Sequence, residues 1–548
     1  MISHIKMKKE GLIMKVADAI VKGLREENVT TVFGYPGAAI MPLYESLRTT
    51  NIHHVLVRQE QAAGHSASGY ARVTGEVGVC VVTSGPGATN IVTGIATAYM
   101  DSIPLVIITG QVKSHLIGKD VFQEVDITGA TEPFVKHSYL VKDATQIPRI
   151  IKEAFYIAKT GRPGPVLIDI PADILEQQIE YNPPKEMNIR GYKPTYHGHI
   201  GQMKRAIKVL EQSKRPLICV GGGVQLANAK KELIQFLELT HIPAVHTLMG
   251  IGNMETHSLY NVGMIGTHGF HHANKAVGKA DVILFIGARI SDRSVPTNIF
   301  HEKAQIIHID VDPAEISKNA QAAIPVVGDA KHILKQMLGL ANPLDTKKWL
   351  EQINSEKEVK EEQHIYEGTV NPKLVIQQLS KMLPDDAVIT GDVGQNQMWT
   401  CRHMEMKGDR QFLTSGGFGT MGYSLPCAIG VAMADKNRKV VSVMGDGSFQ
   451  MSFSELGTLM QEEINPLIIV FNNSKLGMVY EMQYRNYNKE YGVDLKGNPN
   501  FTVIAEAYGI ETAYITKPED ILPVLERAMG HDGPFLIECS VHPQESTL

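Results

Sequence analysis

The 548-residue sequence has few cysteines and only a small excess of acidic charge. Its cysteines are five in number, widely scattered and without paired spacing: Cys80, Cys219, Cys401, Cys427 and Cys539. This pattern argues against a disulfide framework and against a zinc site, so we expect buried, reduced thiols. A net charge of −5 provides no basic surface, and we therefore expect no nucleic-acid partner.

Long apolar runs are absent as well. The apolar stretch near the start is broken by Lys15 and Asp18, and no later run is long enough to cross a bilayer without an intervening charge. Short tandem repeats and low-complexity tracts are also missing. We expect a cytoplasmic protein that does not associate with a membrane.

The chain is far too long for one hydrophobic core and has the length of roughly three domains. Short Val- and Ile-rich runs ending in Gly or Asp are followed by longer amphipathic segments, which is how parallel strands alternate with helices. The runs lie at Val79–Thr83, Leu105–Thr109, Val166–Ile170, Pro216–Gly221, Val282–Ile286, Ile306–Ile309, Ala387–Thr390, Val440–Met444, Leu467–Phe471 and Phe535–Cys539.

The composition changes at two places along the chain. Residues 181–198 are rich in Pro, Gly and Tyr, and residues 344–367 are heavily charged and resemble a solvated helical linker. We predict an α/β protein of three doubly wound, mostly parallel domains, at residues 1–180, 190–343 and 368–548. Ligands are expected at the carboxyl ends of the strands.

Polar residues directly follow two neighbouring strands of the last domain. Gly445-Asp446-Gly447-Ser448 comes after Val440–Met444, and Asn472-Asn473 comes after Leu467–Phe471. A carboxylate, an amide oxygen and a main-chain carbonyl at one rim could hold Mg²⁺ with a diphosphate, and a helix that opens at Gly447 would add N–H donors. Taken singly, each segment is more often a plain turn, but the pair at two strand ends favours the metal site.

Glu60 stands at the end of a hydrophobic run and at the start of a small-residue helix, in the segment Val57–His65. Alone, such a carboxyl is more often a solvated acid at a helix start. A partly buried carboxyl at this place could instead act in proton transfer at neutral pH.

These segments, with several glycine-rich loops, resemble the thiamine-diphosphate enzymes, and in particular the acetohydroxyacid (acetolactate) synthase catalytic subunit. The matching loops are Phe33–Ala38, Ser84–Asn90, Gly391–Asn396, Gly419–Gly422 and Gly477–Val479. Residues outside the shared thiamine signature carry the match to the synthases: Thr109–Val112, Ile117–Glu124, Lys136-His137 and Gly161–Pro165. The resemblance spreads over nearly the whole chain.

The resemblance implies a role for each matching residue. Asp446, the Asn473 side chain and the Lys475 carbonyl would hold magnesium, and Glu60 would protonate N1′ of the aminopyrimidine. Met421 would wedge between the two thiamine rings, and the Gly419 carbonyl would accept from the 4′-amino group. Gly37, Ala38, Phe122, Gln123, Lys136 and Met482 would face the substrates. The other implied thiamine-diphosphate contacts are Tyr35, Pro36, Pro86, Asn90, Val393, Gly394, Gln395, Asn396, Gly447, Ser448, Leu476, Gly477 and Met478.

The middle domain carries Gly-rich and Arg-bearing turns suited to a dinucleotide pyrophosphate, although no G-x-G-x-x-G fingerprint opens it. It resembles the FAD-binding domain of acetohydroxyacid synthases, where the flavin is structural. The implied FAD contacts are Arg162, Gly221, Gly222, Gly223, Thr247, Leu248, Met249, Gly266, Thr267, His268, Gly269, Gly287, Ala288, Arg289, Asp292, Arg293, Asp310, Val311, Asp329 and Ala330. A metal site at His268, His271 and His272 is disfavoured, because no carboxylate or thiol stands at ligand spacing.

Three residues depart from the family pattern. Asn396 stands where His is common, Ala38 where a second Gly is common, and Met482 where most members carry a Trp associated with preference for 2-ketobutyrate. The tail Val541–Leu548 is also shorter than the usual ending, which would reduce a C-terminal lid. The choice of second substrate therefore stays open.

We predict an acetolactate synthase of branched-chain amino acid (isoleucine and valine) biosynthesis that uses thiamine diphosphate, Mg²⁺ and FAD. It would decarboxylate pyruvate and transfer the hydroxyethyl unit to pyruvate or 2-ketobutyrate. A homodimer or dimer of dimers is expected, with a small regulatory subunit as a further candidate partner. The alternatives are a catabolic acetolactate synthase, a flavin-using pyruvate oxidase, and a catalytically dead scaffold. The resemblance implies that catabolic synthases without FAD lack the element that stands here at Gly287-Ala288-Arg289. The scaffold is disfavoured because Glu60, Asp446 and Asn473 are all present.

Overall fold

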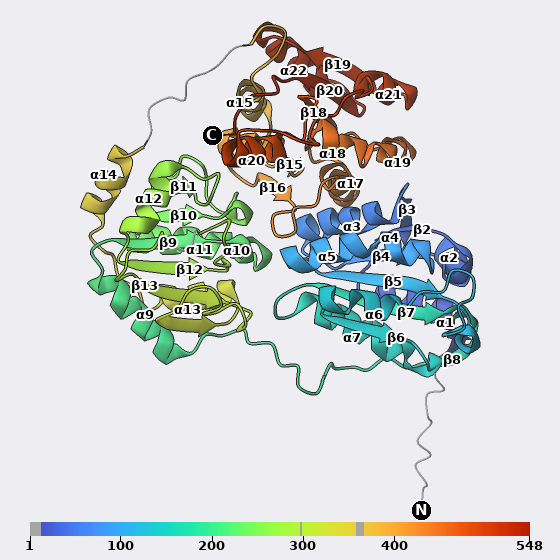
Figure 1. The fold of residues 1–548 in the computed structure, drawn as a ribbon. Coiled ribbons are helices and arrows are strands. Elements are labelled where there is room, and N and C mark those ends of the chain that lie inside the picture. The colour runs from blue at the N-terminus through green and yellow to red at the C-terminus, as the bar shows by residue number, and fades with distance from the viewer. Residues whose placement is uncertain (1–11, 296–298, 358–365, 548) are drawn as a thin grey trace, which may run out of the picture. The chain divides into compact units, whose positions relative to one another are not determined.

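The computed structural model describes residues 12–295, 299–357 and 366–547 and divides the chain into two compact units, Met1–Lys193 and Pro194–Leu548 (Figure 1). Three six-stranded sheets, each parallel throughout, organise the two units. The predicted α/β class with three sheets is confirmed.

The first unit is built on a sheet of order β3-β2-β4-β5-β7-β6. Its strands are β2 (Thr31–Tyr35), β3 (His53–Leu56), β4 (Gly78–Val82), β5 (Leu105–Gln111), β6 (His137–Leu140) and β7 (Pro165–Pro171). Its helices are α1 (Val16–Glu26), α2 (Met41–Arg48), α3 (Glu60–Thr74), α4 (Pro86–Asn90), α5 (Val92–Asp101), α6 (Ile127–Thr131), α7 (Ile147–Lys159) and α8 (Ala172–Leu175). A small antiparallel pair joins β1 (Leu12–Lys15) to β8 (Gln178–Tyr181).

Strands β4, β5 and β7 of this sheet are buried along their whole length, because helices cover both faces. Figure 1 shows α3 and α5 on one face and α7 on the other. Apolar residues recur at three- and four-residue intervals along α7, from Ile147 to Ala158, and they join the core of the unit.

The second unit begins with the central sheet, of order β11-β10-β9-β12-β13-β14. Its strands are β9 (Pro216–Val220), β10 (Ala244–His246), β11 (Asn261–Met264), β12 (Val282–Ile286), β13 (Gln305–Asp310) and β14 (Ile324–Val327). Its helices are α9 (Ile200–Gln212), α10 (Gly222–Leu226), α11 (Lys230–Thr240), α12 (His271–Lys279), α13 (Ala330–Leu338) and α14 (Lys347–Ser355).

The last sheet has the order β16-β15-β17-β18-β20-β19. Its strands are β15 (Val388–Gly391), β16 (Gln411–Thr414), β17 (Val440–Gly445), β18 (Leu467–Asn472), β19 (Glu511–Ile515) and β20 (Phe535–Ser540). Its helices are α15 (Pro372–Met382), α16 (Gln395–His403), α17 (Ser424–Ala434), α18 (Asp446–Gln450), α19 (Leu456–Glu462), α20 (Gly477–Tyr487), α21 (Phe501–Ala507) and α22 (Ile521–Met529).

The strand orders fall into two types when each sheet's strands are numbered along the chain. The first and last sheets both read 2-1-3-4-6-5, whereas the central sheet reads 3-2-1-4-5-6. Each sheet has a reversal of strand order at an inner position, between β2 and β4, between β9 and β12, and between β15 and β17, and the first and last sheets have a second reversal at one edge. Open α/β sheets bind ligands at the carboxyl ends of the strands beside such a reversal.

The linker prediction for residues 344–367 needs a correction. A helix forms there, α14, but it is not solvated all round: Trp349 and Ile353 are buried in the core of the central sheet, and Trp349 Nε1 donates to the Pro216 carbonyl at 3.0 Å. Residues 358–365 of the predicted linker lie outside the described residues. The many charged residues on the exposed side of this helix dominate the composition of the segment, so composition alone did not reveal its buried apolar side.

The expectations of reduced cysteines and of no membrane-spanning segment can be compared with the fold. All five cysteines are free thiols, and four of them are buried. Across the described residues, no helix has both the length and the apolar character needed to span a bilayer.

Candidate active site

Asp446 and Asn473 lie at the same rim of the last sheet. Asp446 is the first residue of α18, directly after β17, and Asn473 directly follows β18. The two strands are parallel neighbours in the sheet, so their carboxyl ends lie side by side. The structure therefore brings together the two segments that the sequence paired.

The Asp446 carboxylate is held inside the protein and is 2% exposed. Asn498 Nδ2 donates to Asp446 Oδ2 at 2.8 Å, and the Gly447 backbone N–H donates to Oδ1 at 3.0 Å. Burial raises the pKa of Asp446 to about 6, although these hydrogen bonds lower it. A desolvated carboxylate of this kind gains from a nearby cation. Sequence reasoning missed Asn498, which comes from a loop without any local motif.

Asn473 is also buried, and its amide belongs to a hydrogen-bonded set. Asn473 Nδ2 donates to Gln395 Oε1 at 2.8 Å, and Asn473 Oδ1 accepts from the Lys475 backbone N–H at 3.1 Å. A Cβ at Gly477 would collide with Gln395 Oε1, so the close approach of the helix start requires glycine. Gln395, Asn473, Lys475 and Gly477 thus lie together.

Asp392, which the sequence placed in a loop without a role, organises the neighbouring loops. Its carboxylate accepts from the backbone N–H groups of Val393, Gly422 and Ser424 at 2.8, 3.0 and 2.8 Å. Burial raises its pKa to about 6 in spite of these donors. Asn396 Nδ2 donates to the Asp392 carbonyl at 2.8 Å. The loop after β15 and the Gly419–Gly422 loop are therefore tied to one carboxylate.

The remaining residues of this rim surround Gly447. A Cβ at Gly447 would lie 3.4 Å from Met421 Cε and 3.0 Å from Leu476 Cδ2. Ser448 Oγ donates to the Val393 carbonyl at 3.4 Å. Gly419 has a φ of +73° and is exposed, and Met478 of α20 is half-buried. The structure leaves Met482, on the same helix, 43% exposed.

The donor set at this rim suits a hard cation. Among the residues that the structure describes, no three His, Cys, Asp or Glu side chains form a cluster able to hold a metal, and this includes the His268, His271 and His272 group. The rim offers one carboxylate, one amide oxygen and the Lys475 carbonyl, which is the mixed oxygen set that Mg²⁺ accepts beside phosphate and water. The Lys475 ammonium forms ion pairs with Glu490 and Asp494, with N–O distances of 2.8 and 2.7 Å.

In the first unit, Glu60 begins α3 on the loop after β3. Asn90 Nδ2 donates to Glu60 Oε2 at 2.9 Å, and a Cβ at Gly87 would lie 3.3 Å from Glu60 Oε1. The same Cβ would lie 2.7 Å from Thr83 Cγ2. The structure therefore joins the Glu60 segment to the Ser84–Asn90 loop, as the resemblance implies.

Thr83 is a further polar group at this rim that sequence reasoning missed. Its side chain is buried beneath Gly37, whose Cβ would be 2.7 Å from Thr83 Oγ1. Thr83 Oγ1 is among the buried polar atoms of the described residues that have no hydrogen-bond partner. An unsatisfied buried hydroxyl beside two glycines indicates a place where a ligand can bind. Tyr35, Pro36, Ala38 and Pro86 line the same rim, exposed.

The Phe122 loop also reaches this rim. A Cβ at Gly85 would lie 2.9 Å from Gln123 Cα, which puts Gln123 against the start of the Ser84–Asn90 loop. Gln123 has a φ of +60°, an unusual conformation for a residue with a side chain, and Phe122 is 86% exposed. Strain and exposure of this kind collect at functional sites.

Two predicted residues do not lie at this rim. Lys136 directly precedes β6, which runs parallel to β7, so it lies at the amino ends of the strands, on the opposite edge from Glu60. Its ammonium donates to the carbonyls of Ile157 and Thr160, the latter at 2.7 Å. Arg162, predicted to contact FAD, donates to Ser102 Oγ at 2.9 Å near the end of α5. The substrate and flavin roles of these two residues stay predictions.

The predicted flavin contacts of the central sheet gather at one rim. The segments follow the carboxyl ends of all six strands: Gly221–Gly223 after β9, Thr247–Met249 after β10, Gly266–Gly269 after β11, Gly287–Arg289 after β12, Asp310-Val311 at the end of β13 and Asp329-Ala330 after β14. Asp292 and Arg293 follow in the loop after β12 and are exposed. His268 lies with them, and burial lowers its pKa.

The glycines of this rim have a packing role as well. A Cβ at Gly221 would collide with the Gly287 carbonyl, and a Cβ at Gly223 would lie 2.7 Å from Gly287 Cα. Two backbones therefore cross closely at β9 and β12, where the strand order reverses. The 3-2-1-4-5-6 order with glycines at this point is the arrangement of dinucleotide-binding domains.

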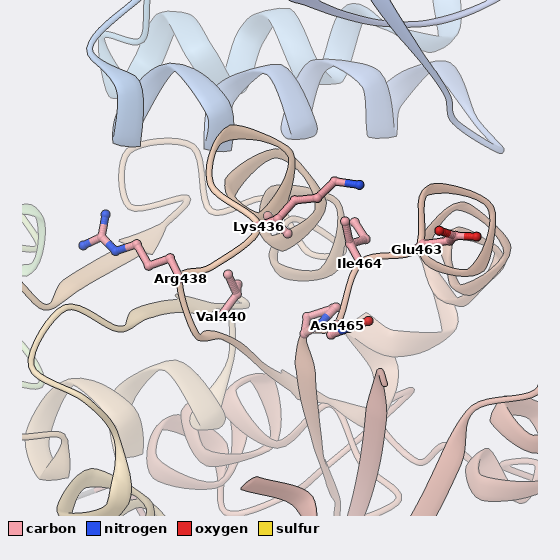
Figure 2. Close-up of a pocket in the computed structure, with 8 residues that line it drawn as sticks. Lys436, Arg438, Val440, Glu463, Ile464 and Asn465 are labelled. Atoms are coloured by element: carbon pink, nitrogen blue, oxygen red, sulfur yellow. The ribbon is translucent and has the colours of Figure 1, made fainter. Parts of the chain in front are cut away.

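One small cavity of the second unit lies away from these rims. It has a volume of about 110 Å³ and is lined by Ala432, Lys436, Arg438, Val440, Glu463, Ile464, Asn465 and Pro466. These residues stand at the amino ends of β17 and β18, opposite to Asp446 and Asn473. Figure 2 shows Lys436 and Arg438 pointing in opposite directions, so the two cations do not converge on a ligand.

Comparisons with known proteins agree with this geometry. Three thiamine pyrophosphate enzyme family models match: the N-terminal TPP binding domain over residues 14–130, the central domain over 203–337 and the C-terminal TPP binding domain over 392–539. The probable acetolactate synthase large subunit of Methanococcus aeolicus is 43% identical, over 97% of this chain and 93% of that protein. The acetolactate synthase isozyme 3 large subunit of Escherichia coli K12 is 44% identical, over 94% of this chain and 92% of that protein. The chain therefore belongs to the acetolactate synthase large-subunit family of thiamine pyrophosphate enzymes.

Proposed function

We propose that this acetolactate synthase works through Glu60 at the rim of the first sheet and through Asp446, Asn473 and the Lys475 carbonyl at the rim of the last sheet. It decarboxylates pyruvate and passes the two-carbon unit to a second 2-keto acid. The observation that carries the proposal is that two sheets of the same strand order each present polar site residues at the carboxyl ends of their strands.

The residues of the last sheet would hold the diphosphate end of the cofactor through magnesium. Asp446, Asn473 and the Lys475 carbonyl supply hard oxygen ligands, and the Gly447 and Ser448 backbone N–H groups at the start of α18 suit an anion. Val393 and Gly394 of the loop after β15, with Gln395 and Asn396 at the start of α16, surround the same place and are held by Asp392.

Glu60 would hold a proton at N1′ of the aminopyrimidine, with Asn90 orienting its carboxyl. Bound thiamine diphosphate supplies the electron sink that makes loss of carbon dioxide from a 2-keto acid possible. Phe122 and Gln123 stand beside the loop that contacts Glu60, where they would line the approach of substrate. Met482 would contact the acceptor.

We also propose that the central sheet binds FAD as a structural cofactor. Support comes from its dinucleotide-type strand order and from the glycine crossing at Gly221, Gly223 and Gly287. Because the reaction starts and ends at one oxidation level, the flavin has no electron to carry.

The proposed domains are residues 1–180 for the pyrimidine, 190–343 for FAD and 368–548 for the diphosphate. A homodimer or dimer of dimers would let the pyrimidine and diphosphate rims meet around one cofactor. Several relatives are named large subunits, which supports a small regulatory subunit as partner. A cytoplasmic enzyme of branched-chain amino acid biosynthesis accords with the five free thiols.

One assay tests these proposals. Purified protein should be yellow, and with pyruvate, thiamine diphosphate and Mg²⁺ it should form acetolactate while the flavin spectrum stays oxidised. Stoichiometric bleaching of the flavin coupled to acetate formation would instead identify a pyruvate oxidase. Acetolactate formed by a protein that binds no flavin would point to the catabolic type.

A further inference from the structure

Residues near the C-terminus form hydrogen bonds with side chains that adjoin the proposed magnesium site. Thr547 is 1% exposed, and its backbone N–H and hydroxyl both donate to the Glu481 carboxylate, at 2.8 and 2.7 Å. The Ser546 carbonyl accepts from Trp399 Nε1 at 2.9 Å. The tail that the sequence marked as short is therefore docked onto α16 and α20.

Gln395 connects this tail to Asn473. Gln395 Nε2 donates to Glu481 Oε1 at 2.8 Å and to the Glu545 carbonyl at 2.9 Å. On its other side, Gln395 Oε1 accepts from Asn473 Nδ2 at 2.8 Å. A continuous path of hydrogen bonds thus runs from Thr547 through Glu481 and Gln395 to Asn473.

The Glu481 carboxylate fixes which way each side-chain amide along this path is turned. A carboxylate only accepts, so Glu481 requires the NH₂ group of Gln395, and the Glu545 carbonyl requires its second hydrogen. The Gln395 amide must then present its oxygen to Asn473. Asn473 donates its own NH₂ group to that oxygen, so Asn473 Oδ1 faces the opposite side, where the Lys475 N–H lies.

We propose that Glu481 and the C-terminal residues Glu545–Thr547 are positioning groups that aim Asn473 Oδ1 at the metal. This inference rests on the proposed role of Asn473 as a magnesium ligand. Without Glu481 and the tail, the Gln395 amide can rotate by half a turn and present its NH₂ group to Asn473, so that only the Lys475 N–H still orients the Asn473 amide. An NH₂ group of Asn473 that faces the site cannot bind a cation. Partners that orient a metal ligand are typically worth about 10- to 100-fold in metal affinity.

Two substitutions at one position separate positioning from charge. Glu481→Ala should weaken Mg²⁺ binding by about 10- to 100-fold in the presence of thiamine diphosphate. Glu481→Gln should bind Mg²⁺ nearly as the parent does, because its oxygen still accepts from Gln395 and Thr547, and its NH₂ group can donate to the Thr547 hydroxyl. Removing residues 545–548 should resemble Glu481→Ala.

The measurement is calorimetric titration of Mg²⁺ into the full-length protein, with the melting temperature of the metal-free protein recorded beside it. Gln483→Ala is the matched control, since Gln483 lies on the same helix but bonds to the Tyr491 backbone. This variant should keep the parent's affinity. For Glu481→Ala, excess Mg²⁺ should restore most of kcat.

Three results would overturn the inference: unchanged Mg²⁺ affinity in Glu481→Ala, equal losses in the Ala and Gln variants, or a loss matched by Gln483→Ala. Asn473→Ala separates this inference from the site assignment. If that variant loses Mg²⁺ binding while Glu481→Ala keeps it, only the positioning role of Glu481 and the tail is wrong. If Asn473→Ala binds Mg²⁺ normally, the proposed metal site itself fails.

Discussion

The first and last sheets share one strand order, yet they hold their site residues in opposite ways. At the last sheet Asp392, Asp446 and Asn473 are buried and hydrogen-bonded before any ligand is considered. At the first sheet Glu60 is half-buried with Asn90 as a partner, and Phe122 projects outward. The same topology therefore supports one preorganised rim and one open rim.

The proposed ligands of the two rims account for the difference. A cation and a diphosphate need fixed oxygens and N–H groups, and such groups must be satisfied among themselves when they are buried. The first rim, which we propose admits the substrates, leaves Phe122 exposed. We expect substitutions at the last sheet to change cofactor binding, and those at the first sheet to change turnover.

The sharpest division between binding and turnover should come from Glu60. Glu60→Gln should retain cofactor affinity but lose about 100- to 10,000-fold in kcat, because an amide cannot supply a proton to N1′. Steady-state acetolactate formation and equilibrium binding of thiamine diphosphate measure both quantities. Near-normal turnover would refute the assignment. Glu76→Gln, which alters an exposed pair with Lys159, should leave both unchanged.

The last sheet should show the reverse behaviour at Asp446. Asp446→Ala should weaken Mg²⁺ and thiamine diphosphate together by more than about 100-fold, since loss of a metal ligand exceeds the effect of losing its outer partners. Equilibrium titrations of each ligand test this. Asp435→Ala, which removes an exposed carboxylate from a turn, is the control. Unchanged affinities for Asp446→Ala would make the Gly-Asp-Gly turn purely structural.

The first sheet also contains one buried acid, Asp169, and its titration can be separated from the site. Its carboxylate accepts from Thr109 Oγ1 at 2.7 Å and from Gln111 Nε2 at 3.0 Å, and Gln111 Nε2 also donates to the Val125 carbonyl. Burial raises its pKa from 3.8 to about 7, with Asp126 adding to the effect. Protonated Asp169 therefore favours the folded state, and this contribution is lost as pH rises from about 4 to about 7.

Relative to Asp169→Asn, the parent should lose at most about 1.4 kcal/mol of stability for each pH unit in that range, and nothing more above it. Melting temperatures of both proteins at several pH values measure the gap. Asp143→Asn should show the opposite slope at acid pH, because the Thr145 side chain lowers the pKa of Asp143. A gap for Asp169→Asn that does not change with pH would contradict the burial argument.

The smallest expected effect concerns the acceptor. Methionine at 482 is narrow and flexible, whereas an indole offers a flat surface for the extra methyl group of 2-ketobutyrate. Met482→Trp should raise the preference for 2-ketobutyrate over pyruvate by about tenfold, within the worth of one methylene in an apolar pocket. Because Met482 is 43% exposed, the larger ring can be accommodated. Competition between the two acids, with both products quantified, gives the ratio, and an unaltered ratio would show that other residues set the choice.

The sequence predicted the buried strands well and the edges poorly. Every strand it singled out is present, because parallel strands covered on both faces are unbroken apolar runs. It did not single out the inner strands β2 and β10, nor any of the six edge strands of the large sheets, β3, β6, β11, β14, β16 and β19. The edge strands β3, β6, β14 and β19 are partly exposed, so their composition does not differ clearly from that of loops.

The site shows the same limit at the level of single residues. Asp446 and Asn473 stand directly after strands, and parallel pairing made their meeting predictable. Asn498 and Thr83 lie outside the matching loops, and Asp392 lies in one of them but was given no role. The roles of all three depend on loops that only tertiary packing brings close. Lys136 matched a family motif, but the direction of β6 puts it at the amino edge of its sheet.

By itself, the sequence determined the three-sheet α/β fold, the thiamine chemistry and the residues that follow the central strands. Local rules suffice for the fold and for the strand-end residues, because strand periodicity and strand-end position are encoded over a few residues. The thiamine chemistry was indicated by the resemblance to a known family. Tertiary structure alone decided which groups are buried, which loops are tied together, and that the C-terminal tail stands behind Asn473 through Glu481 and Gln395. These depend on contacts between residues far apart in the chain, and no local pattern carries the free energy of such contacts.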